Sequence, residues 1–206
     1  MILDIKDSEK VAKILLNINA VKLQPSNFFT WSSGKKSPIY CDNRVILSYP
    51  NEREKIKNIF ASYIKEKIEN VNCIAGVATG AIAHGMMVAS ALNLPFVYVR
   101  EQAKKHGRQN QIEGKLDSES KIIVIEDLIS TGKSSMNAIK AIEDSEAKVI
   151  GLISIFTYSF FNISNLNIPC ASLCDYKTLI EVALRKNIIR KEEMAILEDW
   201  HATFKL

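Results

Sequence analysis

Residues 124–135, VIEDLISTGKSS, contain the side chains whose types and spacing most clearly suggest chemistry. Gly132-Lys133-Ser134 looks like the end of a P-loop, the glycine-rich loop that wraps a nucleoside triphosphate. That motif needs a glycine about five positions before Gly132, and the residue there is Asp127. Because a carboxylate at that position would repel a triphosphate held by backbone amides, the P-loop interpretation fails.

The same stretch nevertheless favours a phosphate site. A strand is expected over residues 121–125 and a helix from Thr131, so backbone N–H groups of residues 131–134 would be free at a helix start. These groups and the helix dipole attract anions. Gly132 allows the backbone to approach a ligand closely, and the nearby serine and threonine hydroxyls add donors.

Glu126 and Asp127 place two acceptors directly before this phosphate site. Adjacent carboxylates at the end of a strand can accept hydrogen bonds from the two neighbouring hydroxyls of a ribose. Acids for the sugar and a helix start for its phosphate together suggest a 5-phosphoribosyl group. An ordinary strand-to-helix turn capped by Ser130 or Thr131 fits the residues of this stretch equally well.

A second group of candidate residues lies in the segment 101–120, EQAKKHGRQNQIEGKLDSES, which is nearly free of apolar side chains. Lys104, Lys105, His106 and Arg108 concentrate positive charge there. A long polar loop inside a compact domain is usually a functional lid or disordered. Taken alone, the charges fit a solvated surface better than a catalytic device.

Alternating apolar runs and amphipathic segments predict the scaffold for these residues. Helices are expected over residues 8–19, 50–70, 82–92, 131–143, 177–186 and 191–205. Strands are expected over residues 73–77, 95–99, 121–125, 149–156 and 170–173, and two short ones with a turn within 28–42. Continuously apolar strands alternating with helices indicate an α/β fold with a mainly parallel sheet covered on both faces. Residues 1–45 are expected to form a small N-terminal hood.

Bulk properties limit the classes of protein that fit. With 206 residues, the chain matches one α/β domain, and its net charge of +4 is too mild to favour nucleic-acid binding. The N-terminus lacks the pattern of a signal peptide, and no apolar run reaches the length of a membrane span. The four cysteines are too sparse for a disulfide framework, and Cys170 and Cys174 have no second ligand pair for zinc. A cytoplasmic protein is therefore expected.

Four stretches carry a resemblance to a known family. The stretch IIVIEDLISTGKSS (122–135) resembles the phosphoribosyl pyrophosphate (PRPP) motif of type I phosphoribosyltransferases. FTWSSGKKSPIYCDNR (29–44) resembles the N-terminal substrate segment of orotate phosphoribosyltransferases, and GVATGAIAHG (76–85) stands in the place of their pyrophosphate loop. VREQAKKHGRQNQIEG (99–114) is similar to their mobile catalytic loop, which gives 100–120 as that loop here. The chain is thus identified as a member of this family.

The resemblance implies the type I phosphoribosyltransferase fold and an Mg²⁺-dependent glycosyltransferase that joins orotate to PRPP. The products would be orotidine 5′-monophosphate and pyrophosphate, in pyrimidine (UMP) biosynthesis. It implies a homodimer in which the loop of each subunit reaches the active site of the other. It also implies that Mg²⁺ is carried mainly by PRPP, with no dedicated protein ligands.

Residue roles follow from the same resemblance. Glu126 and Asp127 would hold the ribose hydroxyls, and Ser130 would also contact orotate. Arg100, Lys104 and His106 would face the pyrophosphate as the catalytic cations. The 5′-phosphate would be wrapped by Leu128, Ile129, Ser130, Thr131, Gly132, Lys133 and Ser134.

Several positions depart from the pattern of the family. Ser32, Gly80 and Glu101 stand where some members carry lysine. Thr157-Tyr158 stands where many carry an orotate-binding arginine, so backbone amides near residues 36 and 37 become candidates for the substrate carboxylate. These positions therefore supply fewer cationic side chains than in those members.

Two alternative functions are considered, and a location is expected for each of two further histidines. A purine phosphoribosyltransferase would share residues 126–134 but not 29–44. A PRPP-sensing regulator would lack the catalytic loop or add a DNA-binding domain. His84 is expected on a helix surface or in the core, and His201 on the surface.

Overall fold

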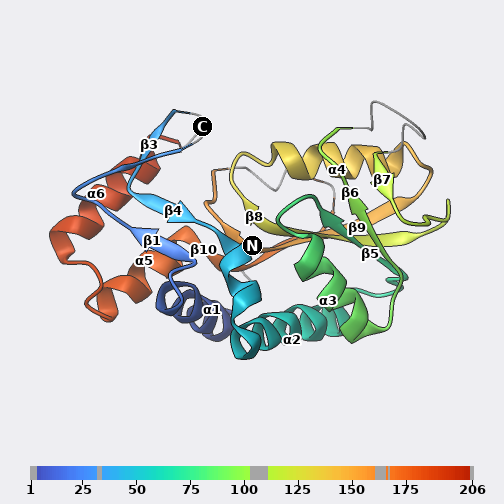
Figure 1. Ribbon diagram of the computed structural model, residues 1–206, viewed down its shortest axis with the longest axis horizontal. Coiled ribbons are helices and arrows are strands. Elements are labelled where there is room, and N and C mark those ends of the chain that lie inside the picture. The colour runs from blue at the N-terminus through green and yellow to red at the C-terminus, as the bar shows by residue number, and fades with distance from the viewer. Residues whose placement is uncertain (1–3, 32–33, 103–110, 161–165, 167, 205–206) are drawn as a thin grey trace.

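The computed structural model describes residues 4–31, 34–102, 111–160, 166 and 168–204 (Figure 1). Its centre is a six-stranded sheet in the order β10-β9-β8-β5-β6-β7, parallel except for β7. The strands are β5 Cys73–Val77, β6 Phe96–Val99, β7 Ile112–Glu113, β8 Lys121–Ile129, β9 Lys148–Thr157 and β10 Cys170–Asp175. This confirms the expected mainly parallel sheet.

Helices cover both faces of this sheet. The α-helices of the described residues are α1 Ile5–Asn17, α2 Pro50–Lys67, α3 Ile82–Leu92, α4 Lys133–Glu143, α5 Tyr176–Arg185 and α6 Lys191–Ala202. Figure 1 shows α4 alone above the sheet, with α1, α2 and α3 below it. A hydrophobic core lies on each face of the sheet. Because successive side chains of β8 point to opposite faces, Ile122 and Val124 belong to the core on the α4 face, and Ile123 and Ile125 belong to the core on the opposite face.

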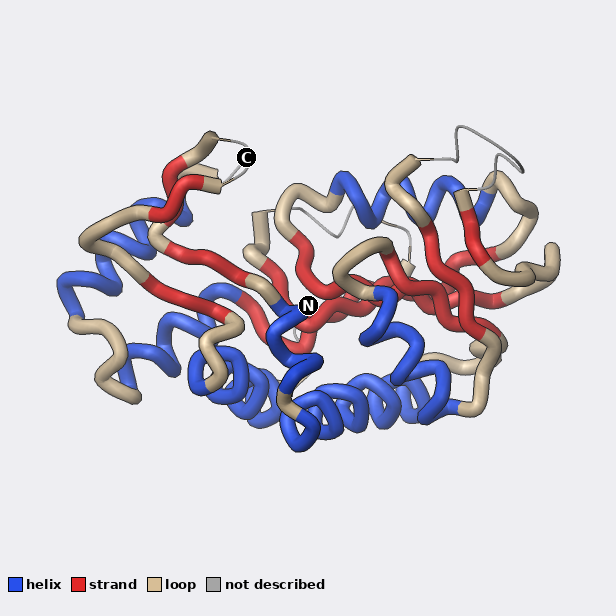
Figure 2. Tube along the Cα trace, in the orientation of Figure 1, coloured by secondary structure: helices blue, strands red, loops and turns tan. Residues whose placement is uncertain are grey.

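A smaller assembly stands at the β10 end of the molecule, and Figure 2 shows its short strands above the helices there. It contains β1 Val21–Leu23, β2 Phe29–Thr30, β3 Lys36–Ser37 and β4 Ile39–Cys41, followed by the 3₁₀ helix η1 Asn43–Ser48. β1 pairs antiparallel with β4, and β2 with β3.

The hood assembly differs in two respects from the residue range 1–45 expected for it. Helix α1, although within that range, packs against α5 and β10 beneath the main sheet. Helix α6, from the other end of the chain, joins the hood strands instead, because Trp200 Nε1 donates to the Lys36 carbonyl at 3.1 Å.

Three further differences affect the site. β8 continues to Ile129 instead of ending at 125, and α4 begins at Lys133 instead of Thr131. Strand β7 lies in the segment expected to be a loop, where its backbone pairs with β6.

No helix in the described part of the chain is long and apolar enough to cross a membrane.

Candidate functional site

The turn between β8 and α4 is built for an anion. Gly132 is the N-cap residue of α4 in the left-handed conformation, with φ 75°, and no side chain caps the helix start. Glycine adopts this φ without the cost that a side chain would impose. The expected capping by Ser130 or Thr131 is wrong, and the N–H groups of the first turn are left available for a ligand.

Glu126 faces α4 from within β8. Its Oε1 accepts hydrogen bonds from the hydroxyls of Ser134 at 2.7 Å and Ser135 at 2.8 Å. Only 3% of the residue is exposed. Burial raises the pKa of Glu126 to about 7, although the two serine hydroxyls oppose the rise by stabilising the carboxylate.

Asp127 faces the opposite side of the strand, since successive side chains of β8 alternate. Its Oδ1 accepts the N–H of Leu128 at 2.9 Å. A Cβ added to Gly80 would lie only 2.2 Å from Asp127 Oδ2, so the carboxylate occupies the space that a side chain at 80 would need. Burial raises the pKa of Asp127, and the charge of Arg44 acts against that rise.

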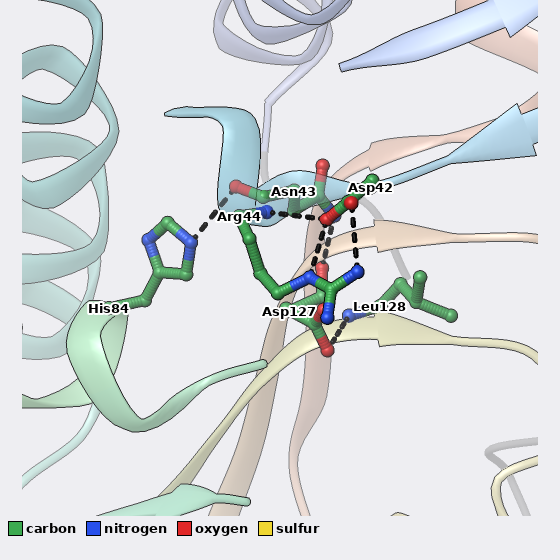
Figure 3. Close-up of polar contacts among 6 residues, drawn as sticks. All are labelled: Asp42, Asn43, Arg44, His84, Asp127 and Leu128. Carbon is green, nitrogen blue, oxygen red and sulfur yellow. Dashed lines mark hydrogen bonds and ion pairs between the residues drawn. The ribbon is translucent and has the colours of Figure 1, made fainter. Parts of the chain in front are cut away.

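A chain of polar contacts fixes Asp127 to the start of η1 (Figure 3). Asn43 Nδ2 donates to the Asp127 carbonyl at 2.6 Å, and His84 Nε2 lies 3.1 Å from the Asn43 carbonyl. His84 is buried on α3, which confirms the core alternative for this residue, and burial lowers its pKa. A neutral His84 therefore donates its Nε2–H to the Asn43 carbonyl. Asn43 in turn holds the backbone of Asp127.

The Arg44 guanidinium lies beside Asp127 in Figure 3. It makes a two-point ion pair with Asp42, through Nε at 2.7 Å and Nη2 at 2.8 Å. Hydrogen bonding to Asp42 raises the pKa of Arg44, which keeps this cation charged at the edge of the site.

A cavity of about 430 Å³ opens next to the β8–α4 turn. Its lining comes from the hood, from the end of β8 and the turn after it, and from the residue after β9: Thr30, Trp31, Tyr40, Cys41, Leu128, Ser130 and Tyr158. Aromatic walls and a few hydroxyl donors suit a flat, polar heterocycle. A hollow of about 520 Å³ between α1 and α2 lies away from the carboxyl ends of the strands, where ligands of such sheets bind.

Arg100 lies at the end of β6, where the segment 101–110 begins. Its N–H donates to the Gln111 carbonyl, and Gln111 Nε2 donates back to the Arg100 carbonyl, both at 2.9 Å. Arg100 Nη1 lies 3.7 Å from Glu113 Oε1 within the same chain. Arg100, at the start of the expected catalytic loop 100–120, is thus bonded to Gln111 within that loop, while Lys104 and His106 lie outside the described residues.

The structure brings most of the predicted residues to one edge of the sheet. Glu126, Asp127 and the turn residues 128–134 lie together, and Ser130 borders both the turn and the cavity. The prediction missed Asn43 and the closeness of Gly80 to Asp127, because no local pattern shows which distant backbone a side chain will contact. His201 was expected on the surface, but its Nε2 contacts the Tyr158 carbonyl and its ring stacks on Tyr176.

Comparisons with known proteins place this geometry in a family. Residues 43–159 match the phosphoribosyl transferase domain. The orotate phosphoribosyltransferase of Bacteroides thetaiotaomicron is 50% identical over 193 residues, covering 92% of this chain and 91% of that protein. The orotate phosphoribosyltransferase of Listeria innocua is 48% identical over 196 residues, covering 93% and 94%.

Solved structures share the fold at lower identity. The crystal structure of orotate phosphoribosyltransferase from Aeropyrum pernix superposes with a TM-score of 0.73 and 24% identity, covering 83% of this chain and 96% of that one. Such a likeness bears on the fold alone, which is that of the type I phosphoribosyltransferases.

Proposed function

The chain belongs to the orotate phosphoribosyltransferases, and we propose that it transfers the 5-phosphoribosyl group of PRPP to orotate. The products are orotidine 5′-monophosphate and pyrophosphate, so the reaction is a step of pyrimidine biosynthesis. The observation that supports this most directly concerns Leu128 and Ser130. Both belong to the segment proposed to hold the phosphate, and both also line the aromatic cavity. A base in the cavity and a phosphate at the helix start would flank the ribose.

The 5′-phosphate is held by the turn and the start of α4, where free N–H groups, Ser130, Thr131 and Ser134 supply donors. Asp127 accepts hydrogen bonds from the ribose hydroxyls. Its backbone is held by Asn43, and its carboxylate occupies the space left by the missing side chain of Gly80. Glu126 is the second acceptor for the ribose. To reach it, Glu126 has to give up hydrogen bonds from Ser134 or Ser135.

Catalysis in this proposal rests on positioning and charge. Displacement at the anomeric carbon builds positive charge on the sugar and negative charge on the departing pyrophosphate. Arg100, Lys104 and His106 stabilise the pyrophosphate, with no covalent nucleophile required. Arg100 stands at the base of its loop, next to Glu113.

The described residues contain no group of three or more His, Cys, Asp or Glu side chains arranged for a metal ion. Mg²⁺ commonly binds through substrate phosphates and one or two carboxylates, and such a pattern needs no protein cage. We propose that PRPP brings Mg²⁺ to the site. When bound, the ion neutralises charge on the pyrophosphate.

We further propose a homodimer whose loops exchange between active sites, and a cytoplasmic location. The loop base at Arg100 and Gln111 lies at the outer end of the sheet, where a neighbouring subunit could receive it. The four free cysteines agree with a reducing compartment.

The test is to incubate the protein with PRPP, Mg²⁺ and one base at a time. Orotate should be consumed, as followed by the loss of its ultraviolet absorbance, with release of pyrophosphate. Adenine, hypoxanthine and xanthine should give no product. Turnover of a purine with none of orotate would replace this function by that of a purine phosphoribosyltransferase.

A further inference from the structure

Tyr158, directly after β9, is fixed from several sides. Its N–H donates to the Ile129 carbonyl at 2.9 Å, and its own carbonyl is contacted by His201 Nε2. The ring centroid lies 5.6 Å from that of Trp31, edge to face, and 5.3 Å from the stacked ring of Phe160. With 3% of the residue exposed, the ring has little freedom to move.

The hydroxyl of this buried tyrosine makes no hydrogen bond within the described part of the chain. Buried tyrosines usually place this group on a partner. Tyr176, in the same aromatic cluster, does so by donating its hydroxyl to the Leu197 carbonyl at 2.9 Å. A fixed phenol without a partner is therefore a donor available to a ligand.

The phenol end of Tyr158 lies on the side of the base cavity. Tyr158 lines that cavity together with Tyr40 and Cys41. Burial raises the pKa of Tyr158 far above neutrality, and Cys41, Tyr176 and Tyr40 add to the rise, so two of these three neighbours are cavity residues. The hydroxyl keeps its proton at neutral pH and can donate it to an oxygen that accepts.

The described lining of the cavity contains no cationic side chain. Lys36 of the hood donates from its Nζ to Thr30 Oγ1, at 2.7 Å, and is not among the residues that line the cavity. An anionic base bound in the cavity therefore has to be recognised largely by neutral donors, and these are the hydroxyls that line it.

We infer that the Tyr158 hydroxyl donates a hydrogen bond to an oxygen of the pyrimidine base and is a specificity-determining residue of this site. The inference rests on the proposed function, because it takes orotate as the base in the cavity. A site that hydrogen-bonds an oxygen of the substrate discriminates strongly against ligands that lack it.

The substitution Tyr158→Phe tests this, because it removes the hydroxyl and keeps the ring contacts. The KM for orotate should rise about ten- to hundredfold, the range expected for a hydrogen bond to a charged group. The KM for PRPP and the melting temperature should stay unchanged, since the hydroxyl contributes no bond to the free protein. Tyr176→Phe is the matched control, and it should lower the melting temperature while leaving both KM values unchanged.

An orotate KM for Tyr158→Phe that stays near the wild-type value would overturn the inference. A parallel rise in the KM values of orotate and PRPP would also overturn it, because that pattern belongs to a general structural defect. Absence of orotate turnover in the wild-type protein would instead reject the proposed function, so the two failures are distinguishable.

Discussion

Two residues proposed for the phosphoribosyl site form a hydrogen bond with each other. Ser134, expected to hold the 5′-phosphate, donates to Glu126, expected to hold the ribose. A ligand has to separate this pair, and each partner then exchanges one hydrogen bond for another. The net cost of such an exchange is small, and the site stays satisfied in both states.

Glu126 gives the folded chain a pH dependence that can be measured. Its pKa is about 7 when folded, above the ordinary value near 4.5 that applies to the unfolded chain. Between these pH values the folded state binds more protons, so its stability falls as pH rises from about 4.5 to about 7. Glu126→Gln cannot ionise and should not show this loss, which amounts to at most about 3 kcal/mol.

The measurement is urea denaturation of both proteins at several pH values. The stability of Glu126→Gln relative to wild type should increase between pH 4.5 and 7. Glu143→Gln, an exposed substitution near the end of α4, should stay within about 0.5 kcal/mol of wild type throughout. A Glu126→Gln curve parallel to that of wild type would contradict the burial of an ionisable carboxyl here.

Gly80 is predicted to leave the space that the Asp127 carboxylate occupies. Its backbone is not among the described left-handed glycines, so the collision with Asp127 is what excludes a side chain there. Gly80→Ala should displace the carboxylate and lower kcat/KM for PRPP by about tenfold or more, the loss of one hydrogen bond to a charged group. The melting temperature should change little, because a short side chain can move.

A double-mutant cycle separates this effect from a general disturbance. In an Asp127→Ala background, the alanine at position 80 meets no carboxylate and should cause no further loss of kcat/KM. Additive losses in the double variant would show that Gly80 acts through something other than Asp127.

At the scale of elements, most segments could be predicted from periodicity, and the errors have physical causes. The apolar run that marks β8 ends at Ile125, yet pairing with β9 continues to Ile129 because Leu128 and Ile129 find partners in Phe156 and Thr157. This extension puts Glu126 and Asp127 on opposite faces of the strand. The local sequence pattern indicated two acids for one ribose. Only the pairing of β8 with β9 decides toward which face of the sheet each carboxylate points.

Helix α6 is expected to stabilise the base cavity from outside. Trp200 is 9% exposed, donates to the Lys36 carbonyl and packs against Trp31, a wall of the cavity, with centroids 5.7 Å apart. Trp200→Ala should destabilise the fold by about 3–5 kcal/mol. It should also raise the KM for orotate more than that for PRPP, since Trp31 loses its support.

Denaturation and steady-state kinetics check this, with two companion variants. Trp200→Phe keeps one aromatic ring but loses the hydrogen bond to Lys36 and part of the packed indole, so its effects should be smaller than those of Trp200→Ala. Ile196→Ala, on an exposed part of the same helix, should change stability by no more than about 0.5 kcal/mol. Equal effects of Trp200→Ala and Ile196→Ala would contradict a specific role for α6.

Across the whole molecule, contacts between distant parts of the chain complete the site, and these could not be predicted. Asn43 lies 84 positions from Asp127, and Lys36 lies 164 from Trp200. The turn proposed for PRPP, by contrast, is one continuous segment whose two acids and glycine are visible in sequence, although its helix begins two residues later than expected. The strand, turn and helix around these residues could therefore be predicted from one continuous segment, whereas the walls of the neighbouring cavity required the packed structure.

The proposed exchange of loops between subunits predicts complementation between two inactive proteins. Lys104→Ala would remove a catalytic cation from the loop, and Asp127→Asn would damage the ribose site but leave the loop intact. If each loop acts in the partner's site, a mixed dimer contains one intact combination, because the good loop of one subunit meets the good site of the other. Random mixing of the two variants in a symmetric dimer should restore about a quarter of wild-type activity.

The variants should be mixed after mild dissociation, with light scattering to verify dimers and each variant treated alone as the control. Loops that act in their own subunit cannot complement, since every site would then combine one damaged part with one intact part of the same chain. An unchanged low activity in verified mixed dimers would therefore reject exchange. It would place Lys104 in the site of its own subunit, where Arg100 already pairs with Glu113 of the same chain.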